Sequence, residues 1–417
     1  MKKLLAVLVL SSAAVPAASG LEIRFLGFYR VAFPSYRESV FNPGNEALRA
    51  LGLTGGAHWT FSQFAGLTFK ALALEWRVEA SLQAAKSPGG RWGTDLTFHQ
   101  VFVQKDFGGG FSVLAGRSIQ RWGTGYAFNP TDFAAPAKEL NDPENRELRQ
   151  VGRDLIKIEY FGDSYSVAVC GLAPAAGRSG DWRPALRIYA NIGHVDLTGV
   201  VLGRPGKSWL WGGSFAVTVG SSLEFHGEIA LQKGSDEPYH PAAWGERAVH
   251  EADPVGPWKS GDGKTYVQGL LGFHTTFPGN VFWVSEYYHR GQGYSASEWD
   301  GILGYLDDLS GRPGLAPPEL LLANRMWCLK VFSPNGAMRD YWMNHLRVPA
   351  AKKDAWSVTH LLNLADGGSV LIPEASWTIG GRFTFYGKSY IFLGDGRSEY
   401  GSFFQSSALE AGLRVIL

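Results

Sequence analysis

Residues 75–83 read EWRVEASLQ and alternate strictly between polar and apolar side chains. Successive side chains of a β-strand point to opposite faces, so this stretch predicts a strand with one apolar face and one charged face. The same alternation recurs along the chain, most clearly in residues 21–31, 222–232 and 405–417. We therefore expect an all-β protein built from strands of this kind.

The composition excludes several other classes of protein. The chain has 417 residues, of which 45% are hydrophobic and 13% aromatic, so it is not intrinsically disordered. A net charge of +1 gives no general reason to bind nucleic acid, and two cysteines exclude a disulfide scaffold. The mean hydropathy of −0.09 argues against a helical membrane protein, which needs repeated apolar runs of about 20 residues.

The N-terminal segment indicates export. Residues 1–20 read MKKLLAVLVLSSAAVPAASG, with two lysines followed by an apolar stretch over 4–15. Ala17 and Ser19 then form a small-residue cleavage site, so we predict a signal peptide over residues 1–20. An uncleaved membrane anchor is the alternative.

The length of the strands and of their connections predicts a transmembrane barrel over residues 21–417, in the outer membrane of a Gram-negative-type envelope. The alternating segments are near the 9–11 residues with which a tilted strand crosses a membrane. Short links such as 107–111 and 161–164 alternate with long ones such as 121–151 and 233–264, as in outer-membrane barrels. Many Trp and Tyr residues lie at segment ends, where interfacial girdles use them. A secreted soluble β-protein shows the same alternation and is the alternative.

The pattern predicts about 18 antiparallel strands, with both termini on the periplasmic side. The alternative is 16 strands, if an extended turn over residues 333–353 removes a hairpin. The predicted strands are 21–31, 57–69, 73–85, 95–106, 111–119, 153–161, 164–174, 183–192, 194–204, 208–219, 222–232, 265–277, 281–290, 323–332, 354–364, 368–379, 382–393 and 405–417.

A barrel of this size encloses a water-filled lumen, and its charged alternate positions are expected to face inward. A Lys or Arg at such a position that faced lipid instead would cost about 2–4 kcal/mol at the bilayer midplane. These charged side chains could form a specific solute site. They could equally be a lining that is only solvated and paired with itself. The predicted lining residues are Glu75, Arg77, Glu79, Lys157, Glu224 and Glu228.

The longest polar connection in the first half of the chain is a candidate constriction. Residues 116–153 read GRSIQRWGTGYAFNPTDFAAPAKELNDPENRELRQVGR, and we expect 120–152 to fold into the lumen, although an outer loop is equally compatible with the sequence. Arginines at the constriction would favour anionic solutes, and acidic residues would favour cations or neutral solutes. The candidate residues here are Arg117, Arg121, Asp132, Glu144 and Arg153.

Three motifs carry a resemblance to a known class. The run GRSIQRWGTGYAFNPTDF at 116–133, LIPEASW at 371–377 and GDGRSEYG at 394–401 resemble segments of porin-like bacterial outer-membrane barrels, including relatives of alginate-export-type channels. The resemblance implies a channel for small hydrophilic solutes or a polymer, surrounded by outer-membrane lipid and placed there by the insertion machinery. A plugged structural or surface-polymer export barrel is the alternative. The chain ends in Leu417 where such barrels usually have an aromatic residue.

Motifs for catalysis are weak. The sequence contains no G-x-S-x-G, H-E-x-x-H or C-x-x-C pattern. We therefore predict that the protein is not an enzyme and needs no cofactor or metal, with a membrane-embedded hydrolase as the third hypothesis. The solute and the oligomeric state do not follow from the sequence.

Overall fold

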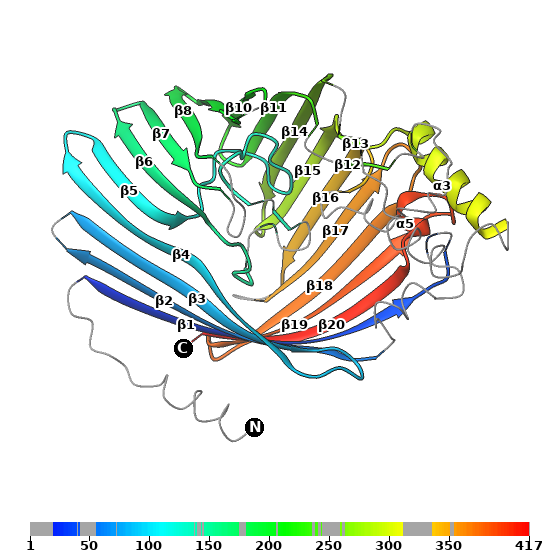
Figure 1. The fold of residues 1–417 in the computed structure, drawn as a ribbon. Coiled ribbons are helices and arrows are strands. Elements are labelled where there is room, and N and C mark those ends of the chain that lie inside the picture. The colour runs from blue at the N-terminus through cyan, green and yellow to red at the C-terminus, as the bar shows by residue number, and fades with distance from the viewer. Residues whose placement is uncertain are drawn as a thin grey trace.

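An 18-stranded antiparallel sheet closes on itself in the computed structural model of this chain (Figure 1). The ring closes because β1 (Leu21–Tyr36) pairs with both β2 (His58–Ala71) and β20 (Gln405–Ile416). Closure leaves no open sheet edge, which satisfies the backbone within lipid. The structure describes residues 20–39, 41, 56–71, 73–136, 138–139, 143, 146–174, 181–205, 207–235, 238–240, 243, 259–260, 263–311, 336–350 and 354–416.

The other barrel strands follow in chain order, each paired with its neighbours along the chain. They are β3 (Leu74–Lys86), β4 (Gly93–Gly108), β5 (Phe111–Ser118), β6 (Arg153–Phe161), β7 (Tyr165–Leu172), β8 (Arg183–Ile192), β9 (Val195–Leu202), β10 (Leu210–Val219), β11 (Leu223–Lys233), β14 (Thr265–Phe277), β15 (Val281–Arg290), β16 (Asp340–Pro349), β17 (Ala355–Asn363), β18 (Ser369–Ile379) and β19 (Phe383–Leu393). A small separate sheet pairs β12 (Pro238–Tyr239) with β13 (Lys259–Ser260).

The predicted strand count is confirmed, but one strand was placed wrongly. The strand between β15 and β17 is β16 at Asp340–Pro349, not residues 323–332, which lie outside the described part of the chain. The inward-facing Tyr341 and Met343 of β16 are buried in an apolar cluster, while the outward-facing Trp342 is exposed. Because both faces of β16 carry large apolar residues, the alternation that marks the other strands is lost there.

The outside of the barrel is apolar and exposed. On β3, Trp76 and Leu82 have 50% and 53% of their surface exposed, whereas the alternating Glu79 has 6%. Exposed aromatic residues gather near both ends of the strands, as expected for interfacial girdles. They include Phe107, Phe111 and Phe161 at one end and Trp59, Trp209 and Trp211 at the other.

The two ends of the barrel differ in their connections. At one end the links are short, as in 109–110, 193–194 and 278–280. Gly110 has a φ of +85°, and a Cβ there would lie 2.2 Å from the carbonyl oxygen of Phe161, so only glycine fits this turn. At the other end the links are long, as in 119–152, 234–264 and 291–339. The strand ends nearest the two termini, Leu21 and Ile416, lie at the short-link end.

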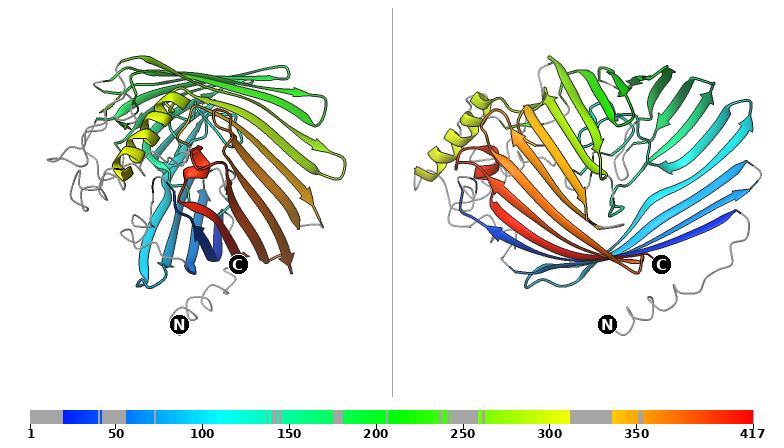
Figure 2. Two further views of the ribbon diagram at one scale, coloured as in Figure 1. Left: turned by 90° about the vertical axis from the view of Figure 1, so that its right-hand side faces the viewer. Right: turned by 180° about the vertical axis from the view of Figure 1, so that it is seen from behind.

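Two helices lie together at the long-link rim, α3 (Ala296–Gly311) and α5 (Glu399–Ser402) (Figure 2). A capping box starts α3, since Glu298 Oε2 accepts from the Ser295 backbone at 2.7 Å and Ser295 Oγ accepts from the Glu298 backbone at 3.3 Å. Ile302 and Leu303 of α3 are fully buried in the apolar cluster of this rim. No helix in the described residues is long and apolar enough to cross a membrane.

Candidate functional site

Most of the predicted lining residues lie on the inner face of the barrel. On β3, Glu75, Arg77 and Glu79 alternate with the exposed Trp76 and Val78 and therefore face inward. Glu79 accepts hydrogen bonds from Arg24 at 2.5 Å and from Gln100 at 2.6 Å, so it is part of a network between strands. The other lining candidates at inward positions of strands are Lys157 and Arg153 on β6, and Glu224 and Glu228 on β11.

Arg117 is placed on the outer face of the barrel, contrary to its assignment as a constriction residue. It is paired in register with Val101, which is 40% exposed, while the neighbouring Ser118 is buried. Its guanidinium makes two hydrogen bonds to Asp154, at 2.9 and 2.8 Å. Arg117 lies at the long-link end of β5, where the cost of a charge facing lipid falls to about 0–1 kcal/mol. Glu144 lies outside the described residues.

The connection between β5 and β6, residues 119–152 and hereafter the inner loop, is bonded to inward-facing side chains of distant strands. Glu228 on β11 is 5% exposed and accepts from the backbone N–H groups of Thr124 at 2.5 Å, Gly125 at 2.8 Å and Thr131 at 3.0 Å. The Thr131 hydroxyl donates to the same carboxylate at 2.7 Å. A carboxylate with this many backbone donors is a strong anchor, because each bond is charge-assisted.

A second carboxylate anchors the next residues of the inner loop. Glu286 on β15 accepts from the backbone N–H of Tyr126, of Ala127 at 2.9 Å and of Phe128 at 3.4 Å. It also bonds His226 Nε2 at 3.0 Å. The ring order of the strands puts β11 and β15 on the far side of the barrel from β5, so the inner loop crosses the lumen to reach them.

The returning half of the inner loop meets the remaining wall. Arg146 makes a two-pronged hydrogen bond to Glu374 on β18, at 2.9 and 3.2 Å. Glu147 Oε2 lies 3.6 Å from Arg30 Nη1 on β1, and the Gln150 carbonyl oxygen lies 3.1 Å from His99 Nδ1 on β4. Glu228, Glu286 and Glu374 each lie near the midpoint of their strands. The inner loop therefore crosses the lumen at about half its height.

The GTG sequence of the inner loop allows this close approach. A Cβ at Gly123 would lie 2.7 Å from Glu228 Oε1, and one at Gly125 would lie 2.0 Å from the Phe128 carbonyl oxygen. Glycine is therefore required at position 125, where the clash is with backbone, while a Cβ at position 123 would displace the Glu228 carboxylate from its place against the loop.

Charged side chains within the inner loop hold its turn. Asp132 accepts hydrogen bonds from the backbone of Trp122 and from Arg121 at 3.4 Å, and Lys138 donates to the Gly125 carbonyl at 2.6 Å. Burial raises the pKa of the Asp132 carboxyl and lowers the pKa of the Lys138 ammonium, because each group loses water. The predicted residues Arg121 and Asp132 therefore pair with each other within the inner loop, and Asp132 also lines a cavity of about 110 Å³ beside it.

Cavities remain beside the returning half of the inner loop. One of about 110 Å³ lies against β1, β16 and β18–β20, and a smaller one of about 20 Å³ lies against β16–β18. Both are lined by Arg146, Arg347 and Glu374, so the Arg146–Glu374 pair separates them. Four basic and two acidic residues line the larger cavity: Arg146, Arg347, Lys388, Arg414, Glu147 and Glu374.

Sequence reasoning missed three of these residues, Arg347, Glu374 and Lys388. The strands of Glu374 and Lys388 were predicted, and their positions in LIPEASW and FTFYGKSY alternate with outward-facing residues, so the same periodicity test would have found them. Arg347 belongs to β16, the strand that was misplaced.

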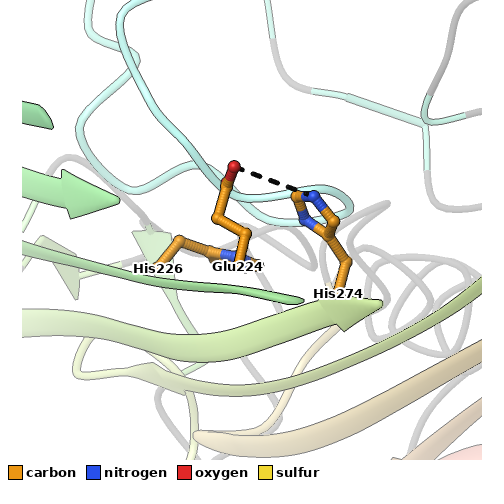
Figure 3. A group of neighbouring side chains, drawn as sticks. All are labelled: Glu224, His226 and His274. Atoms are coloured by element: carbon orange, nitrogen blue, oxygen red, sulfur yellow. Dashed lines mark ion pairs between the residues drawn. The ribbon is translucent and has the colours of Figure 1, made fainter. Parts of the chain in front are cut away.

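The inner face also brings together residues that could hold a metal ion (Figure 3). Glu224 and His226 on β11 approach His274 on β14, with one ligand atom of each within 4.8 Å of the others. The alternation predicted the inward position of Glu224, but the nearby histidines were not recognised as a group.

The comparisons with known proteins identify the fold. No protein-family model matches the chain, and no curated protein matches its sequence. OccAB1 of Acinetobacter baumannii superposes with a TM-score of 0.59 at 8% identity, over 96% of this chain and 98% of that chain. OccK5 (OpdH) of Pseudomonas aeruginosa does so with a TM-score of 0.56 at 6% identity, over 95% and 98%.

A third similar structure is Wzi of Escherichia coli, with a TM-score of 0.53 at 10% identity, over 99% of this chain and 88% of that chain. Wzi is described as an outer membrane protein involved in group 1 capsule assembly and as a carbohydrate-binding β-barrel. At these identities the likeness establishes a shared fold only, that of the outer-membrane barrel. The closed ring of strands and its apolar outer surface point to the same fold without the comparisons.

Proposed function

We propose that this protein is a porin-like channel of the bacterial outer membrane through which small hydrophilic solutes diffuse. The observation that carries the proposal is the contrast between an apolar outer band and a charged inner face within one closed ring. The outer-membrane porins OccAB1 and OccK5 share this fold. The inner loop acts as the constriction, since its described residues bond the wall at half height on several sides.

We further propose that the passage prefers small anions. Its cavity beside the inner loop carries four basic residues against two acidic ones. Arg347 is exposed on the inner wall and makes no ion pair with the described residues. In a narrow, low-dielectric passage, an excess of one sign concentrates the opposite ion.

Planar-bilayer recording of the purified barrel tests both statements. Discrete conductance steps, and a reversal potential of anion-selective sign in a KCl gradient, are expected. Arg347→Ala should shift the reversal potential toward cation selectivity, whereas Arg91→Ala, an exposed arginine of the β3–β4 link, should leave it unchanged. A folded protein that gives no conductance steps would count against a channel.

A plugged barrel that serves surface-polymer assembly is the second candidate. It is favoured by the number of bonds that fix the inner loop across the lumen, and Wzi shows that this fold also occurs in a carbohydrate-binding barrel. Deleting residues 121–149 separates the two. A plugged barrel should gain conductance from none, whereas a constricted channel should conduct before the deletion and change in size and selectivity after it.

Several finer features belong to the proposal. They are cleavage of residues 1–20 as a signal peptide, delivery by the outer-membrane insertion machinery, a relationship to alginate-export-type channels, and the absence of enzymatic activity. N-terminal sequencing of the mature protein tests the first of these, with Gly20 or Leu21 as the expected first residue.

A further inference from the structure

Three ligand-capable side chains face one another on the inner wall between β11 and β14 (Figure 3). They lie near the short-link end of both strands, since Glu224 is one residue from the start of β11 and His274 is three from the end of β14. The register pairs Glu224 directly with His274, and His274 Nε2 lies 3.8 Å from Glu224 Oε2. His226 lies two residues further along the same face of β11. We propose that Glu224, His226 and His274 bind a divalent transition-metal ion, and that Zn²⁺ suits this donor set of two imidazoles and one carboxylate.

The hydrogen bonding of His226 prepares one of its nitrogens for a metal. Its side chain is fully buried, and its Nε2 lies 3.0 Å from Glu286 Oε1. An ionised carboxylate only accepts hydrogen bonds, so Nε2 carries the proton and Nδ1 of the neutral ring carries a lone pair. Nδ1 is buried and has no hydrogen-bond partner in the described part of the chain. Metal-binding histidines typically donate their other ring N–H to a carboxylate in this way.

The surroundings of His226 fix this arrangement. Glu286 is held in turn by the backbone N–H groups of Ala127 and Phe128, at 2.9 and 3.4 Å. Gly272 lies opposite His226 in the register, and a Cβ there would be 2.7 Å from His226 Nε2. The glycine thus leaves the space in which the imidazole lies against Glu286.

The other two ligands are free to close around an ion. The side chains of Glu224 and His274 are 29% and 35% exposed, so they can rotate within the lumen. Ligand atoms of a tetrahedral zinc site lie about 3.4 Å apart. The present separations, which are within 4.8 Å, would therefore have to shorten by up to about 1.4 Å. The fourth position would face the lumen and hold water. Ca²⁺ and Mg²⁺ prefer oxygen ligands alone and are not expected to bind here.

Calorimetric titration of the purified, folded barrel with Zn²⁺ tests the proposal, and the visible absorption of bound Co²⁺ reports the ligand set. We expect one Zn²⁺ per chain, with Mg²⁺ unable to compete. His226→Ala and His274→Ala should each weaken binding by about 10-fold or more, at least as much as losing a group that hydrogen-bonds to a metal ligand does. Glu224→Gln, a conservative change at a partly exposed position, should also weaken binding and change the Co²⁺ spectrum. His194→Ala, in the exposed β8–β9 turn, is the matched control and should bind like the unaltered protein.

Three results would overturn the proposal. They are an unaltered barrel that binds no Zn²⁺, a double variant His226→Ala/His274→Ala that binds it as tightly as before, and a loss in His194→Ala equal to that in His274→Ala. Binding is measured without conductance, so the proposed channel function and this site can fail independently.

Discussion

Replacing Glu228 by alanine should release the first half of the inner loop from the barrel wall. The change removes the acceptor for three backbone N–H groups, those of Thr124, Gly125 and Thr131. A buried donor left without a partner costs about 1–3 kcal/mol. Water can enter the lumen and replace part of each bond, and removing a buried charge returns some free energy. The lower end of the range therefore applies, about 3 kcal/mol in total, or roughly a 150-fold shift toward the undocked loop.

Hydrogen exchange measured by mass spectrometry is the direct assay for this release. Peptides covering residues 122–131 should exchange much faster in Glu228→Ala, while peptides from β11 and β14 should keep their protection. Bilayer recordings should show larger or noisier conductance. Glu159→Ala is the control, because Glu159 is 6% exposed and its ion pairs are to Lys157 and Arg187 on strands. If residues 122–131 exchange equally slowly in both variants and in the unaltered protein, Glu228 is not the anchor.

Three further changes probe other parts of the structure. Arg146→Ala breaks the bidentate pair with Glu374 between the two cavities, so single-channel conductance should rise. Lys388, whose Nζ lies 3.4 Å from Glu374 Oε2, still pairs with the buried carboxylate and limits the stability cost. Trp122→Ala removes a side chain only 5% exposed and should lower the free energy of unfolding by about 3–5 kcal/mol, measured by denaturant titration. Burial raises the pKa of Glu399 in α5 to about 7, so the folded rim favours the protonated acid. The protonated carboxyl stabilises the fold fully below the unfolded pKa of about 4.5, and this contribution of about 3 kcal/mol is lost as pH rises to about 7. Amide hydrogen exchange of α3 should therefore quicken over that pH range in the unaltered protein and not in Glu399→Gln.

The sequence predicts the barrel well because the membrane imposes the strand pattern. Each spanning segment must present apolar side chains to lipid and can present polar ones to water, so alternation marks both the strand and its faces, as it does for Glu75, Arg77 and Glu79. The rule fails where an inner face is itself apolar. Tyr341 and Met343 of β16 pack in the rim cluster, and the strand that carries them was misplaced.

Charge alone also fails to assign a face near the ends of strands. Arg117 looked like a lining residue, yet at the long-link end of β5 an outward arginine paired with Asp154 costs little. The contacts of the inner loop could not be predicted for another reason. Arg146 and Glu374 are 228 positions apart, and no periodicity relates a loop to the strand it reaches across a lumen.

The inner loop and the proposed metal site share one atom, which couples them. Glu286 Oε1 accepts from both His226 Nε2 and the Tyr126 backbone N–H. A metal on Nδ1 of His226 would withdraw electrons from the ring and make Nε2–H a stronger donor, leaving less of the carboxylate's charge for Tyr126. Linkage is reciprocal. The factor by which bound Zn²⁺ favours the released loop is therefore also the factor by which loop release raises the affinity for Zn²⁺. Hydrogen exchange at residues 126–128 should therefore change on addition of Zn²⁺ in the unaltered barrel and not in His274→Ala, and equal exchange with and without the metal would show that the two features are independent.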